Sequence, residues 1–162
     1  MKAMERNRWI VVGVDFSDGS LRALDCALKL ATDVGANVAC VHAYEDAAST
    51  PALDDPAPAI RKQLEDAIAQ STAWSRNIRV DPIVRRGAPW DKLINVATEF
   101  GAELIVVGAD GQRGASNEHF LGTVANRLVI TSSRSVVVVP ASHGLDPRVA
   151  RQAEVGRTPE SR

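Results

Sequence analysis

At 162 residues and 17.3 kDa, the chain has the length of one ordinary domain, and two independent hydrophobic cores would be cramped. Apolar residues make up 45% and charged residues 24%, which argues against a disordered chain or a membrane protein. Nineteen basic and twenty acidic side chains leave a formal net charge of −1, and aromatic residues make up only 4%. Nucleic-acid binders usually carry a basic excess and stacking aromatics, so we expect no nucleic-acid partner.

The two cysteines, Cys26 and Cys40, lie inside apolar segments and show no metal-binding spacing. The apolar run 9–14 is too short for the core of a secretory signal. No run of about 18 apolar residues is present to cross a bilayer. We therefore expect free thiols, a cytoplasmic protein and no membrane partner.

The first half of the chain alternates between strand and helix patterns. The continuous apolar run 9–14 predicts a strand buried on both faces, and residues 37–44 predict a second one. Between them, apolar residues recur at helical spacing over 21–31, and Gly35 provides a helix stop. Residues 46–58 contain three prolines and three acidic residues, which predicts a long loop.

The second half continues the alternation. Helical spacing resumes over 60–74, and a third strand around 78–84 contains Pro82, which belongs where a backbone N–H is not needed. Pro89 suits the first turn of a helix that Gly101 ends. The remaining expected elements are a strand over 104–107, a glycine-rich loop over 108–122, a helix over 123–131 and a strand over 135–139.

This order predicts an α/β domain with a five-stranded parallel sheet, doubly wound, with helices on both faces in an α/β/α sandwich. The domain is expected over residues 8–140. A short tail at 1–7 precedes it, and a polar, mobile tail over 141–162 follows.

In such a sheet, ligands bind beyond the carboxyl ends of the strands, where the strand order reverses. Asp15 arrives there after the first strand, and a glycine-rich loop from Gly108 arrives after the fourth. Glycines allow backbone N–H groups to converge on an anion, and the helix that Gly122 and Thr123 open adds its own free N–H groups. This pairing suits a di- or triphosphate. Alternatively, the glycines only allow a turn and Thr123 only caps a helix.

Other phosphate-binding and nucleophile motifs are absent from the sequence. No Gly-Lys pair is present for a P-loop, and the first strand-to-helix turn lacks G-x-G-x-x-G. No G-x-S-x-G follows a strand. A phosphoacceptor domain is disfavoured because the third strand ends in Arg85 and Arg86 without a neighbouring carboxylate.

The chain resembles a single-domain universal stress protein over residues 8–140. The matching segments, in order, are VGVDFS at 12–17, VHAY at 41–44, GAP at 87–89, AELIVVG at 102–108 and SVVVVP at 135–140. ATP-binding members of that family carry G-x2-G-x9-G-S/T between the fourth strand and the last helix. Gly108, Gly111, Gly122 and Thr123 follow this pattern, although ten residues separate Gly111 from Gly122.

The resemblance implies ATP binding as a stress-linked regulatory signal, with Mg²⁺ accompanying the phosphates. Asp15 would hold the ribose hydroxyls, and the backbone of Ala43 would contact the adenine edge. Glycines of the loop and the start of the last helix would hold the phosphates. The implied nucleotide-binding residues are Gly13, Val14, Asp15, Ala43, Val107, Gly108, Gly111, Gly122, Thr123 and Val124.

Two other functions stay open. The extra loop residue is compatible with an interaction protein of the same fold that binds no nucleotide, and the pocket alternatively takes AMP or a cyclic nucleotide. Asp15 either binds ribose or only caps the first helix. Because no residue is placed as a base for an attacking water, we expect at most slow ATP hydrolysis.

The resemblance also implies a homodimer through the last strand, from Val136 to Val139. If this strand lies at a sheet edge, its unpaired backbone groups favour pairing with a second copy. The alternative is an interior strand that is paired on both sides.

Overall fold

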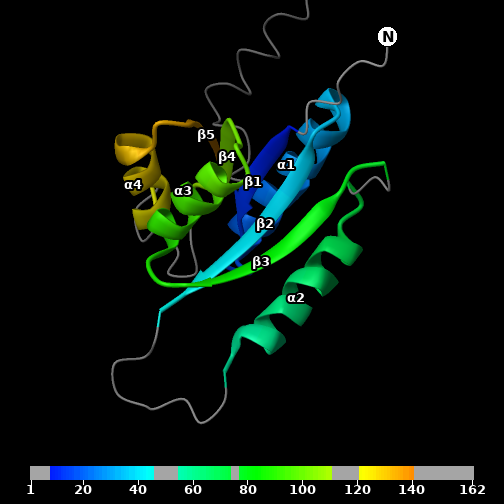
Figure 1. Ribbon diagram of the computed structural model, residues 1–162, viewed down its shortest axis with the longest axis horizontal. Helices are drawn as coiled ribbons and strands as arrows, with labels where there is room; N and C mark the ends of the chain where they lie inside the picture. The colour runs from blue at the N-terminus through cyan, green and yellow to red at the C-terminus, as the bar shows by residue number, and fades with distance from the viewer. Residues whose placement is uncertain (1–7, 46–54, 74–76, 111–120, 141–162) are drawn as a thin grey trace, which may run out of the picture.

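A computed structural model describes residues 8–45, 55–73, 77–110 and 121–140; the predicted tails 1–7 and 141–162 lie outside these ranges. The described strands form one parallel sheet of five strands in the order β3-β2-β1-β4-β5 (Figure 1). The strands are β1 (Trp9–Gly13), β2 (Asn37–Tyr44), β3 (Val80–Arg86), β4 (Leu104–Gly108) and β5 (Ser135–Val139). The helices are α1 (Asp18–Val34), α2 (Ala57–Gln70), α3 (Pro89–Glu99) and α4 (Thr123–Thr131).

Helices cover both faces of the sheet, which confirms the predicted doubly wound α/β fold. Successive side chains of a strand point to opposite faces, so β1 contributes to two separate cores. Val12 packs with α1 and α2, including Leu28, whereas Val11 packs with α3 and α4, including Leu128. Figure 1 shows α3 and α4 side by side on one face. Within the described residues, no helix is long and apolar enough to span a membrane.

Local signals set most element boundaries. The left-handed conformation of Gly35, with φ +64°, ends α1 as predicted. Pro82 lies in β3, which is an edge strand of the sheet, also as predicted. The loop expected over 46–58 is wrong at its end, because α2 already begins at Ala57. Pro58 fits there since the first turn of a helix needs no N–H from it.

The first turn of α1 lies directly against the end of β4. A Cβ atom on Gly108 would lie 2.7 Å from the carbonyl carbon of Gly19 and 2.8 Å from its oxygen. A Cβ atom on Gly19 would in turn lie 2.9 Å from the carbonyl oxygen of Asp110. Because backbone meets backbone on both sides of this contact, a side chain at either position has no room. Glycine at these two positions therefore has a packing reason that is independent of any ligand.

Both Cys26 and Cys40 are free thiols in the structure. Cys40 is buried in the α1/α2 core, and this burial raises the pKa of its thiol to about 12. Cys40 therefore carries no nucleophilic thiolate at neutral pH. Cys40 acts as a small apolar core residue.

The Gly19–Gly108 contact predicts that Gly108→Ala destabilises the protein by about 1–3 kcal/mol, because the added methyl group forces α1 away from β4. Urea unfolding of the ligand-free protein measures this. Gly101→Ala is the control, because Gly101 has φ +62° but nothing within 4 Å of an added Cβ. This variant should lose about 1 kcal/mol of unfolding free energy from backbone strain alone. A Gly108→Ala variant as stable as the wild type would contradict the packing role.

Candidate functional site

The strand order reverses between β1 and β4. From β1, the chain adds β2 and β3 on one side of the sheet and then β4 and β5 on the other. Their carboxyl ends therefore form the switch point where α/β sheets bind ligands. Two helices begin beside this point. α1 follows β1 after a short turn, and the start of α4 is hydrogen-bonded to the residue that follows β4.

Asp15 is held at the switch point by the turn into α1. Ser17 donates to Asp15 Oδ1 through its N–H at 3.0 Å and through its hydroxyl at 2.5 Å, and the Asp15 N–H donates to Ser20 Oγ at 3.2 Å. Ser17 is the N-cap of α1, and its Oγ accepts from the Ser20 N–H at 3.3 Å. The alternative that Asp15 itself caps the helix is therefore wrong. Its carboxylate is half-buried and oriented by the residues that cap the helix.

The neighbouring strand ends contribute backbone and packing. A Cβ atom on Gly13 would lie 3.0 Å from Leu93 Cδ1 and 3.3 Å from Val107 Cγ1, so α3 closes over this glycine. The side chains of Val14 and Val107 are each only 3% exposed and belong to the core. Ala43 is half-buried near the end of β2. These residues can offer a ligand backbone groups and a closed floor, but little side-chain surface.

An aromatic pair that sequence reasoning missed joins the β1–α1 turn to β2. Phe16 has φ +65°, an uncommon conformation for a bulky residue, and its ring stacks on the His42 imidazole with centroids 4.9 Å apart. His42 Nδ1 lies 2.8 Å from the Val14 carbonyl oxygen, to which it donates in the tautomer that carries the hydrogen on Nδ1. The pair fixes the backbone on either side of Asp15. Residue spacing carries no signal for a left-handed aromatic residue.

The end of β4 and the start of α4 are hydrogen-bonded to each other. The Gly122 N–H donates to the Ala109 carbonyl at 2.7 Å, and the Ala109 N–H donates to the Val139 carbonyl at 2.8 Å. The end of β4 therefore lies directly beside the start of α4. Gly111, the middle glycine of the pattern, lies outside the described residues.

The first turn of α4 has no side-chain cap. Gly122 is the N-cap, so the alternative that Thr123 caps the helix is wrong. The N–H of Gly122 is occupied by Ala109, which corrects its expected role as a phosphate donor. Since the first N–H groups of a helix lack intrahelical partners, the available donors are those from Thr123 and Val124 onward. Thr123 is exposed and Val124 is half-buried.

No group of three or more His, Cys, Asp or Glu side chains is arranged to hold a metal ion in the part of the chain that the structure describes. The candidate site thus combines a fixed carboxylate at one helix start with an uncapped second helix start. A carboxylate accepts hydrogen bonds from hydroxyl groups, whereas an uncapped helix start donates to anions.

The sequence model of the universal stress protein family matches residues 6–140. Universal stress protein Rv1636 of Mycobacterium tuberculosis is 37% identical over 138 residues, covering 78% of this chain and 86% of that protein. A crystal structure of a universal stress protein in complex with cAMP has 31% identity and a TM-score of 0.60, covering 82% of this chain and 96% of that one. A universal stress protein from Archaeoglobus fulgidus in complex with dAMP shares the fold, with 23% identity and a TM-score of 0.60 over 80% of this chain and 95% of that one. The chain therefore belongs to the universal stress protein family.

Proposed function

We propose that the protein binds an adenine nucleotide where β1 and β4 end, and that the ligand is ATP, acting as a regulatory signal in the stress response. The observation that carries this proposal is the uncapped start of α4, which the bond from Gly122 to Ala109 holds against the end of β4. Its N–H groups and the positive end of the helix dipole suit a phosphate group. Mg²⁺ would be held through phosphate oxygens.

The hydroxyl-binding end of the site is contiguous with the phosphate end. Ser20 Oγ accepts from the Asp15 N–H, and the Ser20 N–H group lies 3.1 Å from the position of a Cβ on Gly108. Ala109, the next residue, accepts from Gly122. Asp15 and the start of α4 are therefore separated by a short, continuous run of backbone contacts. A nucleoside phosphate has the matching order of groups, with ribose hydroxyls at one end and phosphate at the other.

A cyclic or monophosphate nucleotide is the second candidate, because a relative with 31% identity is described in complex with cAMP. A single phosphate needs only the start of α4, whereas a triphosphate also uses the chain between β4 and α4. A bound ligand stabilises the fold according to its concentration relative to Kd. A larger thermal shift with ATP than with AMP or cAMP at equal concentration would therefore favour ATP.

The proposal predicts that Gly122→Leu lowers ATP affinity at least about tenfold, because the side chain occupies the approach to the free N–H groups. Gly122 has φ −56°, which any L-residue adopts, so α4 itself is not strained. Isothermal titration calorimetry measures the affinity. Gly35→Asn is the control, since Asn tolerates the left-handed C-cap of α1 and lies away from the site.

Two results would contradict nucleotide binding at this position. The first is Gly122→Leu protein that binds ATP as tightly as the wild type. The second is wild-type protein that binds ATP, AMP and cAMP all more weakly than about 1 mM, which would favour an interaction protein without nucleotide.

We also propose a homodimer through β5. Among the described strands, β5 is at the edge of the sheet and pairs only with β4, so the alternative of an interior strand is wrong. Val136 to Val139 are half-buried. In α4, which precedes this strand, Val129 is 54% and Ile130 is 73% exposed. An open strand edge next to exposed apolar side chains favours pairing with a second copy.

The dimer proposal predicts that Ile130→Asp shifts the protein toward monomer, because a charge would be buried at the interface. Sedimentation equilibrium at about 10–100 μM measures the molar mass, where a Kd near 1 μM keeps the wild type mainly dimeric. Val34→Asp, at another exposed apolar position (48%) at the end of α1, is the matched control and should stay dimeric. A monomeric wild type, or a dimeric Ile130→Asp variant, would refute this interface.

We expect the protein to act in the cytoplasm, where free thiols such as those of Cys26 and Cys40 persist. We expect at most slow ATP hydrolysis. The Asp15 carboxylate is engaged by Ser17 and oriented for hydroxyl groups, which does not suit a base for an attacking water.

A further inference from the structure

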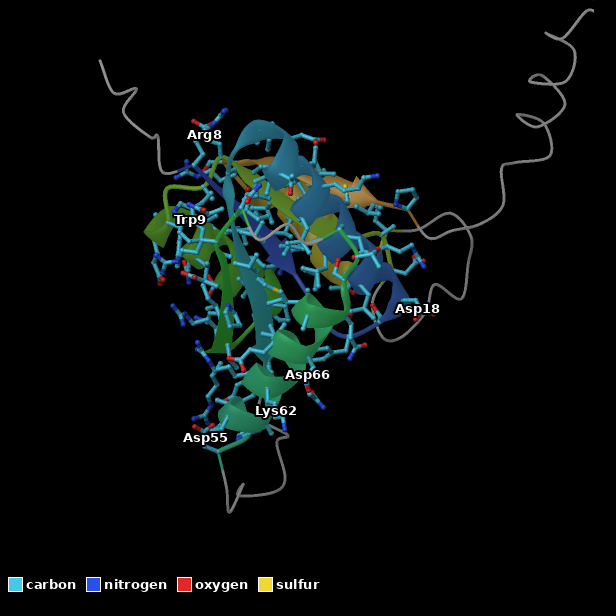
Figure 2. The ribbon with its side chains drawn as sticks, turned by 90° about the vertical axis from the view of Figure 1, so that its right-hand side faces the viewer. Arg8, Trp9, Asp18, Asp55, Lys62 and Asp66 are labelled. Atoms are coloured by element: carbon cyan, nitrogen blue, oxygen red, sulfur yellow. The ribbon has the colours of Figure 1, made fainter. Side chains whose placement is uncertain are left out.

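Two arginines in the described residues stack on tryptophan rings, one near the amino ends and one near the carboxyl ends of the strands. Arg79 lies over Trp9, with Cζ 5.5 Å from the ring centroid, and Arg127 lies over Trp90, with Cζ 5.2 Å from the centroid. Trp9 begins β1 and lies across the domain from Asp18, where α1 begins (Figure 2). Trp90 is in the first turn of α3 and Arg127 is in the second turn of α4. The Trp90–Arg127 pair therefore joins the starts of α3 and α4, at the carboxyl ends of the strands, where the proposed site lies.

The two stacked arginines differ in their hydrogen bonds. Arg79 donates to Asp81 through Nε at 2.7 Å and through Nη2 at 2.8 Å, and this pairing raises the pKa of Arg79. The Arg127 side chain is exposed, and its guanidinium makes no hydrogen bond or ion pair with another described residue. Stacking uses the face of a guanidinium and leaves its N–H donors at the rim. No described residue therefore occupies the guanidinium N–H donors of Arg127, and the stack on Trp90 orients them for an anion.

The position of Arg127 directs these donors toward the start of α4. Arg127 follows Thr123 by four residues and so lies on the same helix face. Side chains of a helix lean toward its N-terminus, which brings the guanidinium back toward Thr123. Trp90 packs against the α3/α4 core one turn before Leu93, the residue that closes over Gly13. The indole is therefore a fixed platform beside the proposed pocket.

We propose that Arg127, held in place by Trp90, contacts a phosphate group of the bound nucleotide and determines the preference for phosphorylated ligands over the nucleoside. This inference rests on the nucleotide binding proposed above. Hydrogen bonds from a guanidinium to phosphate are charge-assisted and stronger than neutral ones. Because the stack already restricts the side chain, less rotamer freedom is lost when the ligand binds.

The test compares dissociation constants for ATP, cAMP and adenosine in wild type, Arg127→Gln and Arg127→Lys by calorimetry at low salt. For ATP or cAMP, whichever binds the wild type more tightly, Arg127→Gln should raise the dissociation constant about tenfold, as expected for a lost charged hydrogen bond. Adenosine should change less than about twofold, since it carries no phosphate to meet the guanidinium. Arg127→Lys should give an intermediate loss because it keeps the charge without the planar fork.

Arg79→Gln is the matched control, because it removes the other stacked arginine and the same charge near the amino ends of the strands. It should leave all three constants unchanged. Equal losses for adenosine and the nucleotide, or no loss for either, would overturn the role of Arg127 while leaving nucleotide binding intact. A wild type that binds none of the three ligands would overturn the proposed function and the role of Arg127 together.

Discussion

The site depends on the backbone contact between Gly19 and Gly108. Because neither residue has a side chain, the first turn of α1 lies against the end of β4 at a distance that no other residue pair would allow. This contact sets the depth at which α1 begins above the sheet. Ser17 and Ser20, one turn of the same helix, then reach Asp15 and hold it at the point where the strand order reverses.

The two helix starts at this point have opposite chemistry. At the start of α1, Ser17 Oγ accepts from the Ser20 N–H and donates to the Asp15 carboxylate, and Ser20 Oγ accepts from the Asp15 N–H. The start of α4 has glycine at its N-cap and no side-chain cap. One helix start therefore presents a carboxylate, an acceptor, whereas the other has no side-chain cap among the described residues and presents N–H donors. This separation of charge is what a ligand with hydroxyls at one end and phosphate at the other requires.

Much of this fold was predictable from the sequence because its signals are local. The bounds of β2, α4 and β5 follow from apolar periodicity, and the edge position of β3 follows from Pro82. Predictions from local sequence failed where the same residue type fits two different local structures. The prolines near residue 57 suit a helix start as well as a loop, and Ser17 rather than Asp15 caps α1.

The sequence placed candidate residues at the reversal of strand order, but it did not reveal the contacts among elements there. The stacking of Phe16 on His42 and of Arg127 on Trp90, and the fit of Gly19 against Gly108, join elements that are far apart along the chain. The spacing of residues along one helix or strand does not indicate which residue of another element they will contact. The glycine pattern likewise did not distinguish a glycine that packs against backbone, such as Gly108, from one at a helix N-cap, such as Gly122.

A nuclear magnetic resonance titration of the isotope-labelled protein with ATP locates the ligand most directly. Amide signals of Asp15, Gly108 and Thr123 should move together with one dissociation constant, because these residues surround the reversal of strand order. Signals of Asn37 and Ser135, which begin β2 and β5 at the opposite edge, should stay in place. Shifts confined to that opposite edge, or no shifts at saturating ATP, would contradict a nucleotide site between β1 and β4.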